Sequence, residues 1–200
     1  MNGGPSEPRF VLASASTRRL DLLRQIGLMP DLVDPAELDE KPRPGETPQA
    51  LAARLAAIKA GTVARRHRGA LVLGADTVVA CGRRVLPKVA DAAEARRCLE
   101  LLSGRRHRVY GGVCVVDPEG RSHSRLAVTT VQFKRLDRKE IEAYVESGEW
   151  RGKAGGYAIQ GRAATMVRRV NGSFSNVIGL PLYETATLLA GLDLRPRGWA

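Results

Sequence analysis

Two arginines stand in the first turn of a predicted helix, directly after a strand that ends in hydroxyl residues. The segment reads Ser14-Ala15-Ser16-Thr17-Arg18-Arg19. Backbone N–H groups at a helix N-terminus favour anions, whereas cationic side chains prefer the other end. A bound phosphate would remove that conflict, because arginine binds phosphate oxygens in a bidentate manner. The segment therefore indicates either a phosphate site or a solvated helix face with a serine cap; the GxxxxGK[ST] pattern of a P-loop is absent.

A carboxylate follows a predicted buried strand. Asp76 comes after the apolar run 71–73, at the end of that strand, and a charge there is costly to bury unless it binds a metal or pairs with a base. No cluster of histidines or cysteines accompanies it, so a metal site would have oxygen ligands suited to Mg²⁺ or Mn²⁺. Glu40 is the candidate second ligand. The alternative is a turn aspartate that accepts hydrogen bonds from nearby N–H groups.

Lysine is scarce in this chain, with 6 lysines against 26 arginines. Three of the six, Lys59, Lys88 and Lys153, lie near the proposed loops and are candidates for holding an anion. For Lys59 the alternative is a favourable interaction with the C-terminal end of its helix. Lys153 opens a glycine-rich stretch, 152–161, in which a backbone could approach a ligand closely. Gln160 in that stretch has both a donor and an acceptor, enough to read a base edge, although an ordinary turn explains the same residues.

Length and composition indicate a globular chain that folds as one domain with two lobes. The chain has 200 residues, of which 44% are hydrophobic and 26% charged, which excludes wholesale disorder. No apolar run approaches the roughly 20 residues that span a bilayer, and the first residues lack an apolar signal core, so we expect a cytoplasmic protein. We expect a flexible segment at 1–8, a single domain at 9–193 and a tail at 194–200.

The net charge of +11 has two explanations, attraction of polyanions or codon bias toward arginine, and the sequence favours neither. An aromatic content of 4% argues against a base-stacking platform for single-stranded nucleic acid.

Three widely spaced cysteines form neither a disulfide framework nor a zinc pattern, and Cys98 and Cys114 are expected to be buried. The three histidines have arginines close by and are expected at the surface: His67, His107 and His123.

Short apolar runs alternate with amphipathic stretches, a pattern typical of an α/β domain. Strands are predicted over 10–13, 71–73, 78–80, 108–116 and 126–133. Helices are predicted from a serine cap at 14 or 16 to about 27, and over 49–64, 91–102, 137–148 and 182–190. Asp137 and Glu140 resemble a capping box. A hairpin is expected at 81–84, with turns at 117–120 and 171–172.

Taken together, these segments resemble the Maf family of nucleotide pyrophosphatases over about 10–189, nearly the whole chain. The order and spacing of the motifs make the resemblance specific. They are Leu12-Ala13-Ser14-Ala15-Ser16-Thr17-Arg18-Arg19, Asp39-Glu40, Arg54-Leu55 with Lys59-Ala60, Gly74-Ala75-Asp76-Thr77-Val78-Val79, Leu102-Ser103-Gly104, Lys153-Ala154-Gly155-Gly156-Tyr157-Ala158-Ile159-Gln160-Gly161, and Asn171-Gly172-Ser173-Phe174-Ser175-Asn176-Val177-Ile178-Gly179-Leu180-Pro181-Leu182.

The resemblance implies an inosine triphosphatase-like α/β fold, with an elongated mixed sheet flanked by helices and two lobes around a central cleft. It also implies hydrolysis of a nucleoside triphosphate to the monophosphate and pyrophosphate, with a divalent cation. By similarity Asp76 is the proton acceptor for the attacking water or a metal ligand, and Glu40 helps to hold the metal. The residues expected to hold the triphosphate are Ser14, Arg18, Arg19, Lys59, Lys88 and Lys153. Lys59 and Lys88 are also expected to be catalytic, because they would stabilise the negative charge that develops as pyrophosphate leaves. Those expected to govern substrate choice are Arg18, Thr77 and Gln160.

Within the family, Arg18-Arg19 and the Lys153–Gly161 loop are similar to the branch that acts on dTTP and UTP, which makes modified pyrimidine triphosphates plausible substrates too. The resemblance also implies a homodimer, nucleotide-pool housecleaning and a link to septum formation. One departure, Pro87-Lys88-Val89 in place of the usual Gly-Lys-Pro, affects the expected position of Lys88. Two rival functions remain open: a nucleic-acid-binding regulator that uses the positive charge, and a nucleotide-binding protein with little turnover.

Overall fold

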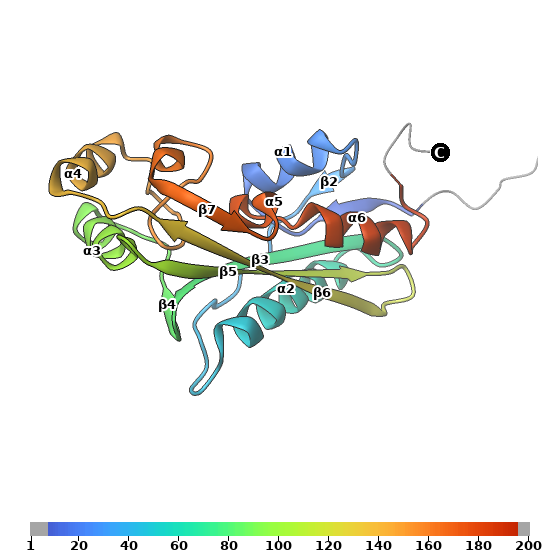
Figure 1. Cartoon of the computed structure of the whole chain (residues 1–200). Helices are drawn as coiled ribbons and strands as arrows, with labels where there is room; N and C mark the ends of the chain where they lie inside the picture. Colours follow the sequence, from blue (N-terminus) through green and yellow to red (C-terminus); the bar gives the residue numbers. More distant parts are fainter. Residues whose placement is uncertain (1–7, 196–200) are drawn as a thin grey trace, which may run out of the picture.

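The computed structural model describes residues 8–195, so most of the segment expected to be flexible at 1–8, and the tail beyond 195, lie outside the described residues. Strands and helices are interspersed along the chain (Figure 1). They are β1 (Phe10–Leu12), α1 (Thr17–Gln25), β2 (Leu32–Val33), α2 (Pro48–Ala64), β3 (Leu71–Cys81), β4 (Arg84–Leu86), α3 (Ala92–Leu102), β5 (Arg106–Val116), β6 (Ser122–Phe133), α4 (Arg138–Ser147), the 3₁₀ helix η1 (Arg162–Met166), β7 (Val167–Asn171), α5 (Phe174–Ile178) and α6 (Leu182–Ala190).

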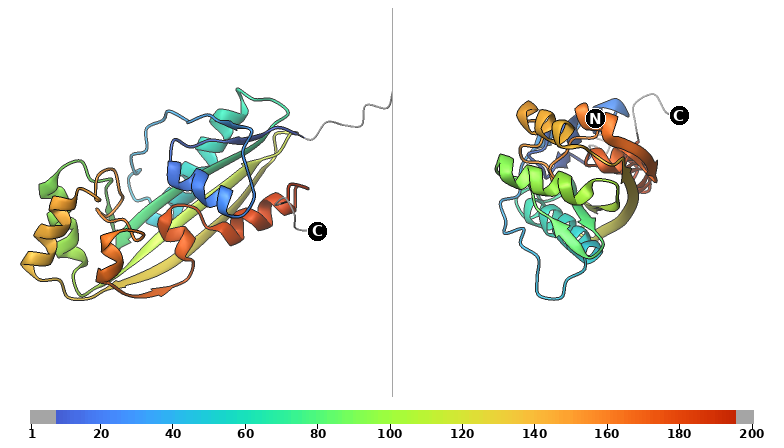
Figure 2. Two further views of the ribbon diagram at one scale, coloured as in Figure 1. Left: turned by 90° about the horizontal axis from the view of Figure 1, so that it is seen from above. Right: turned by 60° about the vertical axis from the view of Figure 1, so that its left-hand side comes forward.

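The strands form one elongated, mixed sheet of seven strands (Figures 1 and 2). Its order is β2-β1-β3-β5-β6-β7, and β4 pairs with β3 beside this path. β1 runs parallel to both β2 and β3, whereas β4, β5, β6 and β7 join antiparallel to their neighbours. The predicted α/β fold with an elongated mixed sheet is therefore confirmed.

One strand, β3, replaces the two strands predicted at 71–73 and 78–80. The intervening Gly-Ala-Asp-Thr stretch pairs with β5 without interruption, from Gly74 opposite Cys114 to Thr77 opposite Gly111. The prediction was wrong because this stretch looks like a turn, whereas a long antiparallel partner holds it extended. Asp76 therefore lies in the middle of a strand and not at its end.

Helix α2 lies very close to one face of the sheet. A Cβ atom at Gly74 would be 2.5 Å from both Ala56 O and Ala60 N, and one at Gly112 would be 2.2 Å from Ala52 O. These glycines of β3 and β5 therefore let the helix backbone approach the strands directly. Alternate residues of a strand share a face, so Asp76 points to the α2 side together with Gly74. The helix spans nearly the predicted range, with Thr47 as its N-cap.

The other face of the sheet is covered by α1, α5 and α6, while α3 and α4 pack together at one end (Figures 1 and 2). The main hydrophobic core lies beneath these helices and includes Leu23, Leu99, Phe133 and Leu189. Two smaller clusters lie on the α2 side. The hairpin at 81–84 and the capping box of Asp137 and Glu140 are confirmed.

The interpretation of the histidines as surface residues is wrong for His107, which is 2% exposed. Its neighbours Arg106 and Arg108 are exposed, and because side chains alternate along β5, His107 points the opposite way, into the core. Its ring packs edge-on against Phe133 and Tyr157. Cys98 and Cys114 are buried, as predicted. The segments β2, β7, η1 and α5 have no counterpart among the predicted elements.

Candidate active site

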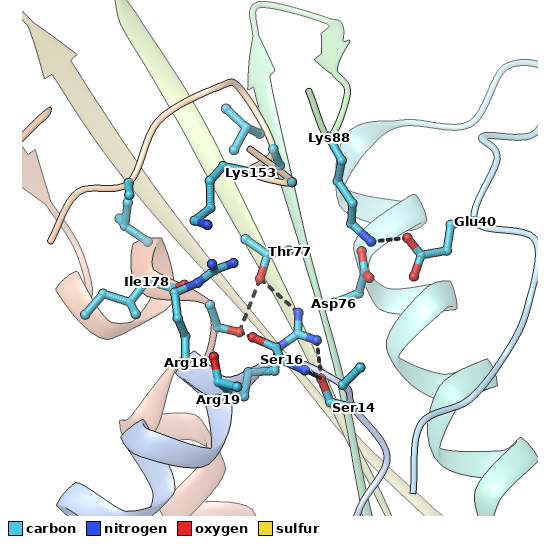
Figure 3. A pocket seen from close by; sticks show the side chains of 18 of the residues that line it. Ser14, Ser16, Arg18, Arg19, Glu40, Asp76, Thr77, Lys88, Lys153 and Ile178 are labelled. Atoms are coloured by element: carbon cyan, nitrogen blue, oxygen red, sulfur yellow. Dashed lines mark hydrogen bonds and ion pairs between the residues drawn. The ribbon is translucent and has the colours of Figure 1, made fainter. Parts of the chain in front are cut away.

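The candidate site lies where β3 changes partners along one edge. β1 pairs with β3 up to Leu73, and β4 pairs with it from Val79, so within residues 8–195 no strand neighbours positions 74–78 on that edge. A cavity of about 440 Å³ opens there, within the size range of small-molecule sites. Its lining contains every residue that the sequence analysis proposed for the site, and Figure 3 labels all of them except Lys59 and Gln160. These are Ser14, Arg18, Arg19, Glu40, Lys59, Asp76, Thr77, Lys88, Lys153 and Gln160.

Two carboxylates share one buried lysine on the α2 side of the cavity. Lys59 Nζ lies 2.6 Å from Asp76 Oδ1 and 2.5 Å from Glu40 Oε1. The Lys59 and Asp76 side chains are nearly buried, whereas that of Glu40 is about one-third exposed. The helix-dipole interpretation of Lys59 is therefore wrong, because its ammonium group turns inward to the carboxylates and is not at the helix end.

Lys88, just after β4, reaches one of these two carboxylates, and its ammonium group contacts Glu40 (Figure 3). Its backbone is fixed by pairing with the glycine-rich loop: Gly155 N donates to Pro87 O at 3.0 Å and Val89 N donates to Lys153 O at 3.1 Å. The Pro87-Lys88-Val89 sequence thus holds Lys88 in the cavity wall. Partial burial raises the pKa of Glu40, but hydrogen bonds from the two lysines outweigh it and lower the pKa to about 2.

The two arginines line the opposite wall, and backbone carbonyls at the C-terminal end of α5 orient them. Arg18 Nε donates to Ile178 O at 3.2 Å, and Arg19 Nε donates to Gly179 O at 2.8 Å. Arg19 also donates to Ser14 Oγ at 2.9 Å and to Thr77 Oγ1 at 3.3 Å (Figure 3). Burial lowers the pKa of Arg19 from its usual value, and the nearby Asp76 carboxylate opposes this shift.

The expected serine cap of α1 takes a different form. Ser16 occupies the N-cap position, but its side chain makes no capping hydrogen bond. Ser14 Oγ instead accepts from Ser16 N at 3.2 Å and from the Arg19 guanidinium. The two arginines are therefore held by protein acceptors, and their positions are fixed before any anion binds.

The glycine-rich loop closes the cavity on the side of α3 and α4. Gly155 and Gly156 have φ near +73° and +71°, a conformation that favours glycine. Buried tyrosines hold the loop: the Tyr157 hydroxyl lies 2.8 Å from His107 Nε2, and Ala158 N donates to the Tyr144 hydroxyl at 3.0 Å. Lys153 and the exposed Gln160 both line the cavity. Sequence reasoning missed these buried supports and the carbonyls near α5, because backbone acceptors leave no side-chain signal.

The cavity is electropositive, with five cationic side chains and two carboxylates among the described residues that line it. Such a lining is suited to a multiply charged anion such as a triphosphate. Glu40 and Asp76 give a pair of oxygen donors, as Mg²⁺ or Mn²⁺ prefers, and Mg²⁺ commonly takes its other ligands from substrate phosphates and water. Within residues 8–195 no group of three or more His, Cys, Asp or Glu side chains is placed to hold a metal.

A family model described as Maf-like protein matches residues 9–192. The chain belongs to the Maf family. One relative, from Paramagnetospirillum magneticum, is named dTTP/UTP pyrophosphatase. It is 64% identical to this Maf protein over 187 residues, which cover 94% of this chain and 98% of the relative. A protein of the same name from Rhodospirillum rubrum is 61% identical, over 94% of this chain and 89% of that one.

Among solved structures, a HAM1 protein from Coxiella burnetii is similar to the Maf chain with a TM-score of 0.54 and 18% identity. The match covers 92% of this chain and 99% of that chain. At that identity the likeness shows the fold alone. In the part of the Maf chain that the structure describes, no helix is both long and apolar enough to cross a membrane.

Proposed function

We propose that this Maf-family protein is a nucleoside triphosphate pyrophosphatase that hydrolyses dTTP and UTP to the monophosphate and pyrophosphate. The observation that carries the proposal is the cavity at the β3 edge, where cationic side chains from α1, α2, the segment after β4 and the glycine-rich loop surround a pair of carboxylates. The names of the relatives that are 61–64% identical support the choice of substrates.

The arginine wall binds the phosphates in this proposal. Arg18 and Arg19 offer guanidinium groups to phosphate oxygens, and Lys153 adds charge from the loop. Ser14 and Thr77 hold Arg19 in place through their hydroxyls. Gln160 borders the cavity and discriminates among bases, since an amide side chain both donates and accepts hydrogen bonds. Thr77 also borders the cavity, and its part in substrate choice rests on the family resemblance.

The carboxylate wall carries out the hydrolysis. A divalent cation held by Glu40 and Asp76 would neutralise phosphate charge and lower the pKa of a bound water. Asp76 accepts a proton from the water that attacks the α-phosphorus, or it serves only to hold the cation. The two roles predict a different dependence of the Asp76→Asn rate on metal concentration. Lys59 orients both carboxylates, and Lys88 stabilises negative charge on the departing pyrophosphate.

A nucleotide panel tests this proposal, with pyrophosphate and orthophosphate measured separately in Mg²⁺ or Mn²⁺. We expect pyrophosphate from dTTP and UTP, and a fall of about 100-fold or more in kcat for Asp76→Asn. Asp117→Asn is the matched control, because Asp117 is also buried but lies in the β5–β6 turn, away from the cavity. Wild-type turnover in Asp76→Asn, or orthophosphate as the product, would overturn the proposal.

The metal dependence of the variant separates the two roles of Asp76. If Asp76 only holds the cation, raising the Mn²⁺ concentration restores much of the lost rate. If it accepts the proton, saturating Mn²⁺ leaves the rate low. Absence of product from every nucleotide in the wild type would favour one of the two rivals, a nucleotide-binding protein with little turnover or a nucleic-acid-binding regulator.

Further parts of the proposal rest on the family resemblance. We propose that the substrates include base-modified pyrimidine triphosphates, that the protein removes them from the cytoplasmic nucleotide pool, and that it acts as a homodimer with a role linked to septum formation. Light scattering of the purified protein decides the oligomeric state. Adding modified pyrimidine triphosphates to the panel tests the range of substrates, and deletion of the gene tests the septum phenotype.

A further inference from the structure

The short helix α5 belongs to a motif, 171–182, to which the proposed function assigns no role. Its C-terminal end provides the two consecutive carbonyls, Ile178 O and Gly179 O, that accept from the Nε atoms of Arg18 and Arg19. Carbonyls at the end of a helix have no partners within the helix and carry partial negative charge. The position of α5 therefore sets the direction in which both guanidinium groups point.

A buried amide ties α5 to the sheet. Asn176 is 0% exposed, and its Nδ2 donates to Val109 O at 3.1 Å and to Thr129 Oγ1 at 3.0 Å. The Thr129 hydroxyl in turn donates to Ser173 O and accepts from Ser173 N, both at 3.1 Å. These bonds join α5 and its cap to the neighbouring strands β5 and β6.

The sheet leaves room for this amide at one glycine. A Cβ atom at Gly111 would lie 1.8 Å from Asn176 Oδ1, so only glycine permits the observed approach. Rotating the amide by half a turn would place Oδ1 against Val109 O, where two acceptors repel, so the orientation is fixed. Neither Asn176 nor Thr129 lines the cavity.

We propose that Asn176 is a positioning residue for the phosphate-binding arginines. Through α5 it holds the carbonyls of Ile178 and Gly179 at the positions that direct Arg18 and Arg19 into the cavity. Thr129 completes the same attachment. The inference rests on the proposed function, since it takes the cavity to hold a triphosphate, but its test has a readout that needs no turnover.

The test measures binding of inorganic tripolyphosphate by calorimetry, so that only contacts to phosphates contribute. We expect Asn176→Ala to weaken binding by about 10-fold, because a small misplacement of positioning groups is costly. Thr129→Val removes the same attachment without changing the shape of the side chain, and we expect it to weaken binding in the same direction. It also keeps the test decisive if Asn176→Ala does not fold.

Thr185→Val is the matched control. Thr129 and Thr185 are both 0% exposed, but Thr185 Oγ1 donates to the O atom of Pro181, the N-cap residue of its own helix, α6. We expect this variant to lower the Tm while leaving the Kd for tripolyphosphate within about twofold of wild type. Equal losses of affinity in Thr129→Val and Thr185→Val would show a general effect of destabilisation and overturn the inference.

A double-mutant cycle adds a readout that a purely structural role would not change. If Asn176 acts through the arginines, the effect of Asn176→Ala shrinks in an Arg18→Met background, because part of what it positions is already gone. Equal effects in both backgrounds would contradict the inference. Wild-type protein that binds tripolyphosphate but does not hydrolyse dTTP or UTP would refute the proposed function alone; wild-type protein that hydrolyses them but does not bind tripolyphosphate would refute this inference alone.

Discussion

Replacing Lys59 with methionine removes the ammonium group that two carboxylates share. Lys59 Nζ is 2.5 Å from Glu40 Oε1 and 2.6 Å from Asp76 Oδ1, and its side chain is only 8% exposed. Methionine keeps most of the apolar stem, so the change removes charge more than volume. Breaking a buried ion pair on one side leaves an unpaired charge, which typically costs 3–5 kcal/mol. Because Glu40 is partly exposed and keeps its contact with Lys88, we expect a loss of about 3 kcal/mol in the free energy of unfolding.

Urea unfolding in buffer with a chelator measures this loss, and Lys41→Met is the matched control. Lys41 pairs with Asp39 at 3.9 Å, but these two side chains are 87% and 69% exposed. Water and salt screen such a pair, so the same substitution there should change the free energy of unfolding by less than about 1 kcal/mol. Equal small losses in both variants would refute the view that Lys59 neutralises two buried carboxylates.

The same variant reports on the proposed metal site. Without Lys59, no ammonium group bridges Glu40 and Asp76, and Lys88 contacts only Glu40, so added Mn²⁺ should bind more tightly. A ligand at 100 times its Kd stabilises the folded protein by about 2.7 kcal/mol. We therefore expect Mn²⁺ to restore most of the stability lost in Lys59→Met and to raise the Tm of that variant more than that of the wild type. Equal shifts in both proteins would argue against these two residues as the metal ligands.

Two further predictions concern the supports of the site. Burial lowers the pKa of His107 from 6.5 to about 4, so on acidification the unfolded chain takes up a proton before the native protein does and stability falls between these values. We expect His107 to account for about 2 kcal/mol of the free energy of unfolding that is lost from pH 7 to pH 5. Urea unfolding of His107→Gln at several pH values should show a free energy of unfolding that depends less steeply on pH. An unchanged pH dependence would refute the assignment. Gly74→Ala places a Cβ atom against the α2 backbone, so we expect it to cost about 1–3 kcal/mol and to slow turnover by moving Lys59 away from Asp76. Gly61→Ala, in open space on the same helix, should be neutral or stabilising, and a Gly74→Ala protein as active and stable as the wild type would contradict this packing.

Several site residues could be proposed from local patterns in the sequence, whereas others, such as Thr77, were proposed only from the family resemblance. Arg18 and Arg19 contradict the helix dipole, and Asp76 interrupts an apolar run. What the sequence did not reveal is how these motifs meet. The continuity of β3 through Asp76 depends on a partner strand more than 30 residues later in the chain, and no local pattern encodes that pairing.

His107 shows a different kind of failure. An arginine on each side suggests a surface segment, yet a strand with a period of two places the middle residue on the opposite face from both neighbours. Alternation within β5 could have predicted its burial. The contacts of the Ile178 and Gly179 carbonyls with the arginines could not be predicted in this way, because every residue has a carbonyl and only the folded chain shows which ones face an arginine.

The unpaired edge of β3 explains how two kinds of chemistry meet in one cavity. Successive side chains of a strand point to opposite faces, so Asp76 faces α2 and Lys59, while Thr77 faces Gly179 and Arg19. Inside a fully paired sheet these two sets would be separated by the backbone layer. Where β1 has ended and β4 has not begun, no strand covers the edge, and the cavity extends around it to both faces. The lysine-bridged carboxylates therefore approach from one face and the arginines from the other, and a bound triphosphate can contact both at once.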